Sequence, residues 1–101
     1  MDKIINNNIS NIQALCKKHR VQSLYVFGSA ATDALTKNSD VDLLVTFEPD
    51  FIKGYLSNYF SMTGELEKVL NKSIDLVEQT AMTNPYFIES VNQSKVLIYE
   101  R

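Results

Sequence analysis

The sequence predicts a small α/β or α+β domain, in which one small mixed β-sheet is flanked by helices. A length of 101 residues suits one domain, so residues 1–101 are expected to form a single unit. Segments with helical spacing of apolar residues alternate with short, apolar, β-prone runs. The predicted order is helix, strand, strand, helix, strand, helix, strand, which indicates one mixed sheet.

Three helices are predicted from apolar spacing and from start signals. Residues 5–16 place apolar side chains at steps of four, three and four, which is the helical period. Residues 52–70 keep helical spacing, although Gly64 weakens the middle of that segment. The dipeptide Asn84-Pro85 predicts a third helix that runs to about residue 92, because proline suits the first helical position.

Four strands are predicted from short apolar runs bounded by turn residues. The runs are 23–27, 41–47, 73–77 and 96–99. The first ends at Gly28, and the second is stopped by Glu48-Pro49-Asp50. The continuous apolar run within residues 23–27 is typical of a buried strand.

Some side-chain environments also follow from position on the helices. His19 lies at the basic end of the first helix, where the helix dipole favours positive charge, and is expected to be solvated. On the second helix, Leu56 and Phe60 are expected to face the core, whereas the orientation of Tyr55 and Tyr59 stays open.

The composition argues against several classes of function. The formal net charge is −2, which gives no support to direct nucleic-acid binding or to binding of acidic membranes. No apolar run approaches the roughly 18–20 residues needed to span a bilayer, and the N-terminus resembles no signal peptide. Cys16 is the single cysteine and is expected to be a small core hydrophobe. A single cysteine cannot form an internal disulfide, so nothing in the sequence requires an oxidising compartment, and the expected location is the cytoplasm.

Two closely spaced acids open the second predicted strand. Because side chains alternate across a strand, Asp40 and Asp42 are expected on one face, and Val41 and Leu43 on the other. Two carboxylates about 6.5–7 Å apart along a strand can converge on a divalent ion. Mg²⁺ suits such a site, since it takes a few carboxylates together with phosphate oxygens and water. The competing interpretation is turn capping by the acids after Asn38-Ser39.

Two further features belong to the same hypothesis. Gly28 lets the backbone approach a phosphate closely, and Ser29 offers a hydroxyl and an N–H. If a helix opens at Ser29, its free N–H groups add a weakly positive anion site. Asp75 lies on the third strand, and beside the second strand it would complete a carboxylate triad, as general base or as metal ligand. Its competing interpretation is an edge-strand acid that faces solvent.

Gly28-Ser29, a ten-residue gap and then Asp40-Val41-Asp42 resemble the signature of the DNA polymerase beta-like nucleotidyltransferase superfamily. The short chain is similar to its minimal nucleotidyltransferase (MNT) domains. The resemblance implies that Asp40 and Asp42 bind Mg²⁺, that Gly28 and Ser29 hold a triphosphate, and that Asp75 is the third carboxylate. It also implies transfer of a nucleoside monophosphate from a nucleoside triphosphate to a hydroxyl, with release of pyrophosphate.

The resemblance further implies a partner. MNT proteins typically act as antitoxins of a HEPN-domain ribonuclease, and characterised members add AMP from ATP to a tyrosine of that toxin. A hetero-oligomer of the two chains is therefore expected. One departure concerns the residues after the Gly-Ser pair, where many members carry arginines: here the stretch is Ala30-Ala31-Thr32-Asp33. Bidentate phosphate contacts are lost locally, and Lys37 could replace part of that charge.

Two other functions stay open beside catalysis on a toxin. The missing arginines favour an antitoxin that neutralises its partner by steric masking alone. A small-molecule nucleotidyltransferase is the other alternative, although it would need a second chain to supply a substrate domain. Neither a GxxxxGK[ST] loop nor a GxGxxG motif is present, and Ser29 has no histidine partner at motif spacing.

Overall fold

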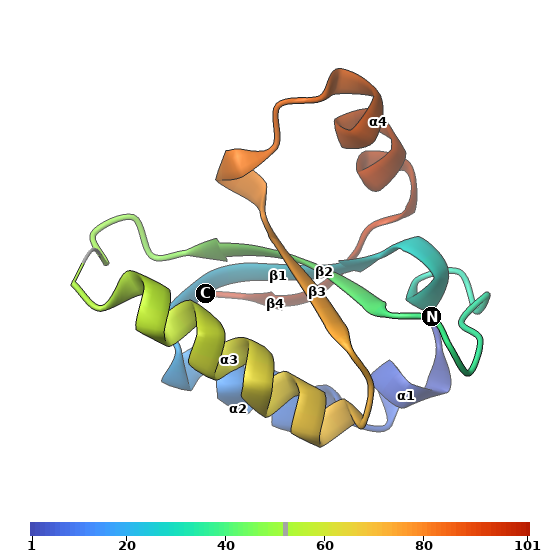
Figure 1. The fold of residues 1–101 in the computed structure, drawn as a ribbon, viewed down its shortest axis with the longest axis horizontal. Coiled ribbons are helices and arrows are strands. Elements are labelled where there is room, and N and C mark those ends of the chain that lie inside the picture. The colour runs from blue at the N-terminus through green and yellow to red at the C-terminus, as the bar shows by residue number, and fades with distance from the viewer. Residues whose placement is uncertain (52) are drawn as a thin grey trace.

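The computed structural model describes residues 1–51 and 53–101 and has the predicted order of elements, except that two helices precede the first strand (Figure 1). The helices are α1 (Lys3–Asn6), α2 (Ile9–Lys18), α3 (Tyr55–Leu70) and α4 (Pro85–Ser94). The strands are β1 (Val21–Phe27), β2 (Val41–Phe47), β3 (Ile74–Glu78) and β4 (Val96–Glu100). Short 3₁₀ turns follow β1 (η1, Gly28–Ala30) and β3 (η2, Gln79–Ala81). Ile52, with which the predicted second long helix begins, lies outside the described residues.

The first predicted helix is two helices, so its prediction as one continuous segment was wrong. Asp2 caps α1 by accepting a hydrogen bond from the Ile4 N–H at 2.9 Å. The Asn8 side chain donates to the Ile4 carbonyl at 2.8 Å, and Asn8 then precedes α2 with non-helical backbone angles. Asparagine side chains compete for backbone hydrogen bonds in this way and favour helix ends over helix interiors.

The four strands form one mixed sheet in the order β3-β2-β1-β4. Strand β1 is antiparallel to both of its neighbours, whereas β2 and β3 are parallel. Parallel neighbours need a long crossover, and α3 supplies it here. The fold therefore confirms the prediction of a small mixed sheet flanked by helices.

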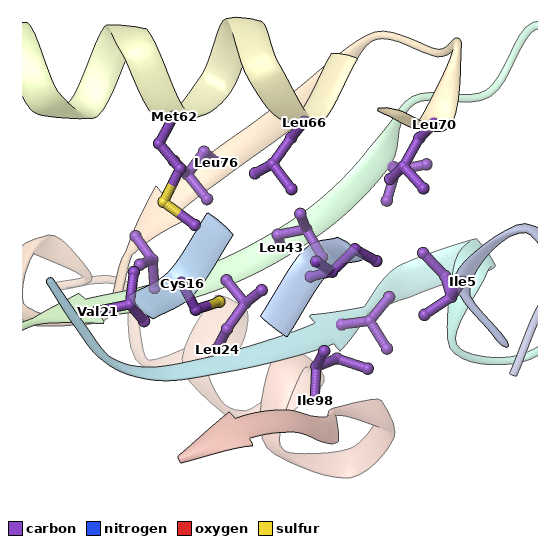
Figure 2. Packing of buried hydrophobic residues seen from close by; sticks show 14 of the residues in the cluster. Ile5, Cys16, Val21, Leu24, Leu43, Met62, Leu66, Leu70, Leu76 and Ile98 are labelled. Carbon is purple, nitrogen blue, oxygen red and sulfur yellow. The ribbon is translucent and has the colours of Figure 1, made fainter. Parts of the chain in front are cut away.

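The main hydrophobic core lies between one face of the sheet and helices α1, α2 and α3 (Figure 2). Leu24 and Leu43 of the sheet, Cys16 of α2, and Met62 and Leu66 of α3 are fully buried in it. The complete burial of Cys16 confirms its prediction as a core hydrophobe. The same burial raises the pKa of its thiol to about 12 and keeps the thiol neutral.

The opposite face of the sheet is covered in part by α4, which lies across the sheet from α2 and α3 (Figure 1). Val91 of α4 packs there against Phe27 and Leu44, and Tyr25 and Val77 border this smaller cluster. Because α4 covers this face only in part, polar side chains on it remain accessible. None of the helices in the described ranges is long and apolar enough to cross a membrane.

The predicted inward orientation of Leu56 and Phe60 on α3 was wrong, because their side chains are 67% and 66% exposed. Tyr55 and Tyr59 face the core instead. The Tyr55 ring packs edge-on against Phe47 at 5.3 Å between centroids, and the Tyr59 hydroxyl donates to the carbonyl of Leu76. Tyrosine can take such a half-buried position because its hydroxyl finds a partner at the border of the core.

His19 is 4% exposed, so its prediction as a solvated residue was also wrong. Its Nδ1 lies 2.9 Å from Oδ1 of Asn58, and its Nε2 lies 2.5 Å from Oε2 of Glu65. Asn58 in turn donates its amide N–H to the His19 carbonyl at 2.8 Å. Both partners lie on α3, far away in the sequence, so the helix-end position of His19 gave no sign of them.

Replacing Glu65 by glutamine is expected to destabilise the chain at neutral pH and to matter less in acid. The hydrogen bonds from His19 and then from Lys18 lower the pKa of Glu65 from 4.5 to about 2. Between these values the unfolded chain binds a proton that the folded chain does not. The stabilisation is therefore complete above about pH 4.5 and is lost as the pH falls towards 2.

Thermal unfolding midpoints of both chains between pH 7 and pH 2.5 test this prediction. The gap between wild type and Glu65→Gln should narrow steadily below about pH 4.5. A gap that stays constant over this range would contradict the role of the charged carboxylate.

Candidate active site

Asp42 and Asp75 lie side by side on the sheet face that α4 covers only in part. They are direct partners in the register of the parallel strands β2 and β3. Neighbouring strands are about 4.8 Å apart, and residues in register point to the same face, so the two carboxylates share one patch of surface. Asp42 is half-buried, whereas Asp75 is exposed on the edge strand. Side chains alternate along β3 as well, since Leu76 packs in the main core and Val77 in the smaller cluster.

Gly28 lies next to Asp42. Phe27, the last residue of β1, is the register partner of Asp42, and Gly28 follows it directly. Its φ of +68° belongs to the left-handed region that glycine adopts without strain. A Cβ at this position would collide with Oδ2 of Asp42 and would lie 3.4 Å from its Cγ. The position therefore requires a residue without a Cβ, because the Asp42 carboxylate packs against it. This requirement is separate from the expected role of Gly28 beside a phosphate.

Ser29 is half-buried in the turn η1 and, like Gly28, lies at the end of β1. Its carbonyl accepts hydrogen bonds from the N–H groups of Ala34 at 2.9 Å and Thr32 at 3.3 Å. Only one 3₁₀ turn opens at Gly28, so the longer helix considered for this position does not form. An anion site here would depend on the Ser29 hydroxyl and on individual N–H groups.

Asp40 precedes β2 and is exposed, and its charge still reaches Asp42. Desolvation by burial, then the charge of Asp75, then that of Asp40 raise the pKa of Asp42. All three effects disfavour the ionised form of Asp42. A cation placed among these carboxylates would reverse the two electrostatic effects.

The donor set fits Mg²⁺, because it consists of carboxylate oxygens at an accessible surface. Within residues 1–51 and 53–101, no group of three or more His, Cys, Asp or Glu side chains is arranged to hold an ion by itself. Mg²⁺ commonly binds one or two carboxylates and fills its remaining positions with water and substrate phosphates. The residues present therefore fit a metal that is bound together with a nucleotide.

Helix α4 contributes residues to this site that the sequence patterns did not single out. The Ser94 hydroxyl accepts a hydrogen bond from the Gly28 N–H at 3.4 Å. Phe87 packs edge-on against Phe27, with 6.0 Å between ring centroids. The Asn84-Pro85 signal predicted the helix, and the Asn84 side chain does cap it at 2.9 Å from the Tyr86 N–H. That signal carries no information about where the helix docks.

The sequence model of the family "Polymerase beta, Nucleotidyltransferase" matches residues 10–101. The chain belongs to this nucleotidyltransferase family, which confirms the resemblance drawn from Gly28-Ser29 and Asp40-Val41-Asp42. It is 34% identical over 86 residues to a "putative protein adenylyltransferase" of Methanocaldococcus jannaschii, with 83% of each chain covered.

Solved structures agree with this assignment. The chain resembles a structure described as a "putative minimal nucleotidyltransferase", with a TM-score of 0.78, 28% identity and 95% of each chain covered. It also shares its fold with a complex of a tri-AMPylated Shewanella oneidensis HEPN toxin and an MNT antitoxin. That second match has a TM-score of 0.66 and 17% identity, and covers 95% of this chain and 72% of the other.

Proposed function

We propose that the chain is the antitoxin of a HEPN/MNT pair and that it transfers AMP from ATP to a tyrosine hydroxyl of its HEPN toxin, with Mg²⁺. The observation that carries the proposal is the placement of Asp42 beside Asp75 and beneath Gly28 on one accessible face. Membership of the nucleotidyltransferase family and the M. jannaschii relative's name support it. The shared fold with an MNT antitoxin is consistent with it.

In this proposal the residues divide the work between metal and phosphate. Asp40 and Asp42 would hold Mg²⁺, which neutralises phosphate charge when it is bound, and Asp75 would serve either as a third ligand or as the base. Gly28 would let the triphosphate approach the turn closely, and Ser29 would hold it through its backbone N–H and its hydroxyl. Burial, and then the charges of Asp75 and Asp40, raise the pKa of Asp42, and a bound cation would relieve the repulsion among these carboxylates.

The bond changes are those of an in-line displacement. The tyrosine oxygen forms a bond to the α-phosphorus of ATP, and the bond from that phosphorus to the bridging oxygen breaks. Pyrophosphate leaves, and the hydroxyl proton passes to a base, for which Asp75 is the candidate because it is the most exposed acid on the strands of the site. Residues 1–101 act as one domain in this proposal, and the partner supplies the acceptor. The reaction would take place in the cytoplasm.

The test is the intact mass of the HEPN partner after incubation with the chain, ATP and Mg²⁺. A gain of one or more AMP units is expected, and it should be absent with the Asp40→Ala/Asp42→Ala variant. The enzymatic proposal would be overturned if the mass of the partner did not change although the two chains form a stable complex, and if the variant formed that complex and silenced the partner equally well.

Steric masking is the alternative that such a result would leave. One structural observation favours it: Ala30 and Ala31, in the stretch where many family members have arginines, are buried small residues. They contribute packing to the turn and bring no positive charge to a phosphate. A partner whose mass never changes, with AMP found instead on an added small hydroxyl compound, would point to a small-molecule nucleotidyltransferase.

A further inference from the structure

Lys72, in the connection between α3 and β3, donates hydrogen bonds to three backbone carbonyls of another loop. Its Nζ lies 3.0 Å from the carbonyl oxygen of Thr36, 3.3 Å from that of Lys37 and 3.2 Å from that of Ser39. An ammonium group has three N–H donors and no acceptor, so these contacts use its full capacity. The Lys72 ammonium therefore has no N–H left to donate to a phosphate.

The loop that Lys72 holds leads from the Gly28-Ser29 turn to Asp40. Its end is a closed turn in which the Ser39 N–H donates to the Thr36 carbonyl at 3.1 Å. The Thr36 N–H donates to the Ser39 hydroxyl at 3.0 Å. These bonds shape the turn internally, and the Lys72 ammonium ties the turn to the segment that precedes β3.

The two peptide groups that flank Asp40 form hydrogen bonds with two consecutive residues, one with Lys72 and the other with Ser73. The carbonyl before Asp40 belongs to Ser39 and accepts from Lys72. The N–H after Asp40 belongs to Val41 and donates to the Ser73 carbonyl at 2.9 Å. The same segment enters β3 and reaches Asp75 two residues later. Residues 72–73 thus fix the backbone at Asp40 relative to the strand that carries Asp75.

Asp40 needs such support more than the other acids do. It lies before the first residue of β2, outside the hydrogen-bonded ladder that orients Asp42 and Asp75, and its side chain is exposed. Displacement of a reacting group or ligand by about 1 Å can cost a factor of about 10² in rate. Residues that orient a metal ligand typically contribute a factor of about 10–100 in metal affinity.

We infer that Lys72 is a positioning residue of the active site, which fixes the Thr36–Ser39 turn and with it the orientation of Asp40. This inference rests on the proposed function only in giving Asp40 a metal to hold. The backbone clamp itself is measurable without any activity.

Lys72→Met keeps the aliphatic stem and removes the ammonium, so it is the variant that tests the clamp. Amide hydrogen exchange over residues 36–41 should become faster than in wild type. The affinity for Mn²⁺, measured with a non-hydrolysable ATP analogue bound, should fall about 10–100-fold. The concentration of Mg²⁺ that gives half the maximal rate of AMP transfer should rise in parallel. Lys72→Arg should recover part of each effect, because guanidinium also donates to carbonyls.

Lys68→Met is the matched control, since Lys68 is an exposed lysine in the last turn of α3. It should leave exchange, Mn²⁺ affinity and Mg²⁺ dependence unchanged. Lys72→Met with wild-type exchange over residues 36–41 and wild-type Mn²⁺ affinity would overturn the inference. A lower unfolding midpoint with unaltered Mn²⁺ affinity of the folded chain would also overturn it, because the role would then be structural only. If the wild type transfers no AMP yet binds Mn²⁺ more tightly than Lys72→Met does, the proposed function fails and the positioning role stands.

Discussion

Replacing Asp42 by asparagine is expected to lower the rate of AMP transfer by about 10³-fold or more, equal to about 4 kcal/mol of transition-state stabilisation. Asparagine keeps the size of the side chain and removes its negative charge. Asp42 is the central acid of the site, because it is half-buried and feels the charges of both Asp75 and Asp40. Its loss should therefore weaken the hold on a cation more than the loss of an exposed acid would.

The same substitution is expected to leave the fold intact or slightly stabilised. Burial, and then the charges of Asp75 and Asp40, raise the pKa of Asp42 and disfavour its ionised form in the folded chain, so a neutral amide removes a desolvation cost as well as a repulsion. Initial rates of AMP transfer at saturating ATP and the thermal unfolding midpoint together measure both effects. Asp50→Asn, at an acid that is 81% exposed and lies after β2, is the control for loss of one charge. Retention of more than about a tenth of the wild-type rate would contradict a central role for Asp42.

The sequence predicts best those elements whose signals are local. Strand β2 has the predicted bounds of residues 41–47, because an apolar run ends there at Glu48-Pro49-Asp50. Helix α4 begins at Pro85 as predicted, because proline occupies the first helical position and Asn84 caps it. In both places the information lies within a few residues of the boundary.

The orientation of side chains on α3 depends on contacts that a helical repeat does not specify. Leu56 and Phe60 are more apolar than Tyr55 and Tyr59, yet the tyrosines face the sheet. Their inward position follows the phase set by Met62, which is fully buried three residues after Tyr59. The hydroxyl of Tyr59 then finds the Leu76 carbonyl, a partner on β3 that periodicity alone could not supply.

The candidate site likewise combines features that local sequence signals predict with contacts that form only in the fold. The spacing of Gly28-Ser29 and Asp40-Val41-Asp42 was sufficient to predict the family, since this pattern lies within fifteen consecutive residues of the sequence. The register that pairs Asp42 with Asp75, however, arises only when β3 returns beside β2 through α3. The contacts of Ser94 with Gly28 and of Lys72 with the loop before Asp40 join residues more than 30 positions apart. Such long-range contacts depend on the completed fold.

Gly28→Ala is expected to impair both stability and AMP transfer, because two separate costs meet at this position. Alanine in the left-handed region, at a φ of +68°, costs about 1–2 kcal/mol of folding free energy. Its Cβ would also collide with Oδ2 of Asp42 and push that carboxylate away from its place beside Asp75. A displacement of about 1 Å in the site should lower the rate of transfer about 10²-fold.

Gly54→Ala separates the two costs, because Gly54 has a φ of +75° and nothing lies within 4 Å of the place where its Cβ would be. Both variants should lose unfolding free energy in denaturant titrations, since both force alanine into the left-handed region, and Gly28→Ala should lose more because its Cβ also displaces the Asp42 carboxylate. Only Gly28→Ala should lose transfer activity when rates are measured on fully folded protein. Equal activity in the two variants would mean that the position of the Asp42 carboxylate does not limit the reaction. An activity loss confined to Gly28→Ala would instead trace catalysis to the contact between the turn after β1 and the acid of β2, which is where the Gly-Ser and Asp-x-Asp halves of the sequence pattern meet in the fold.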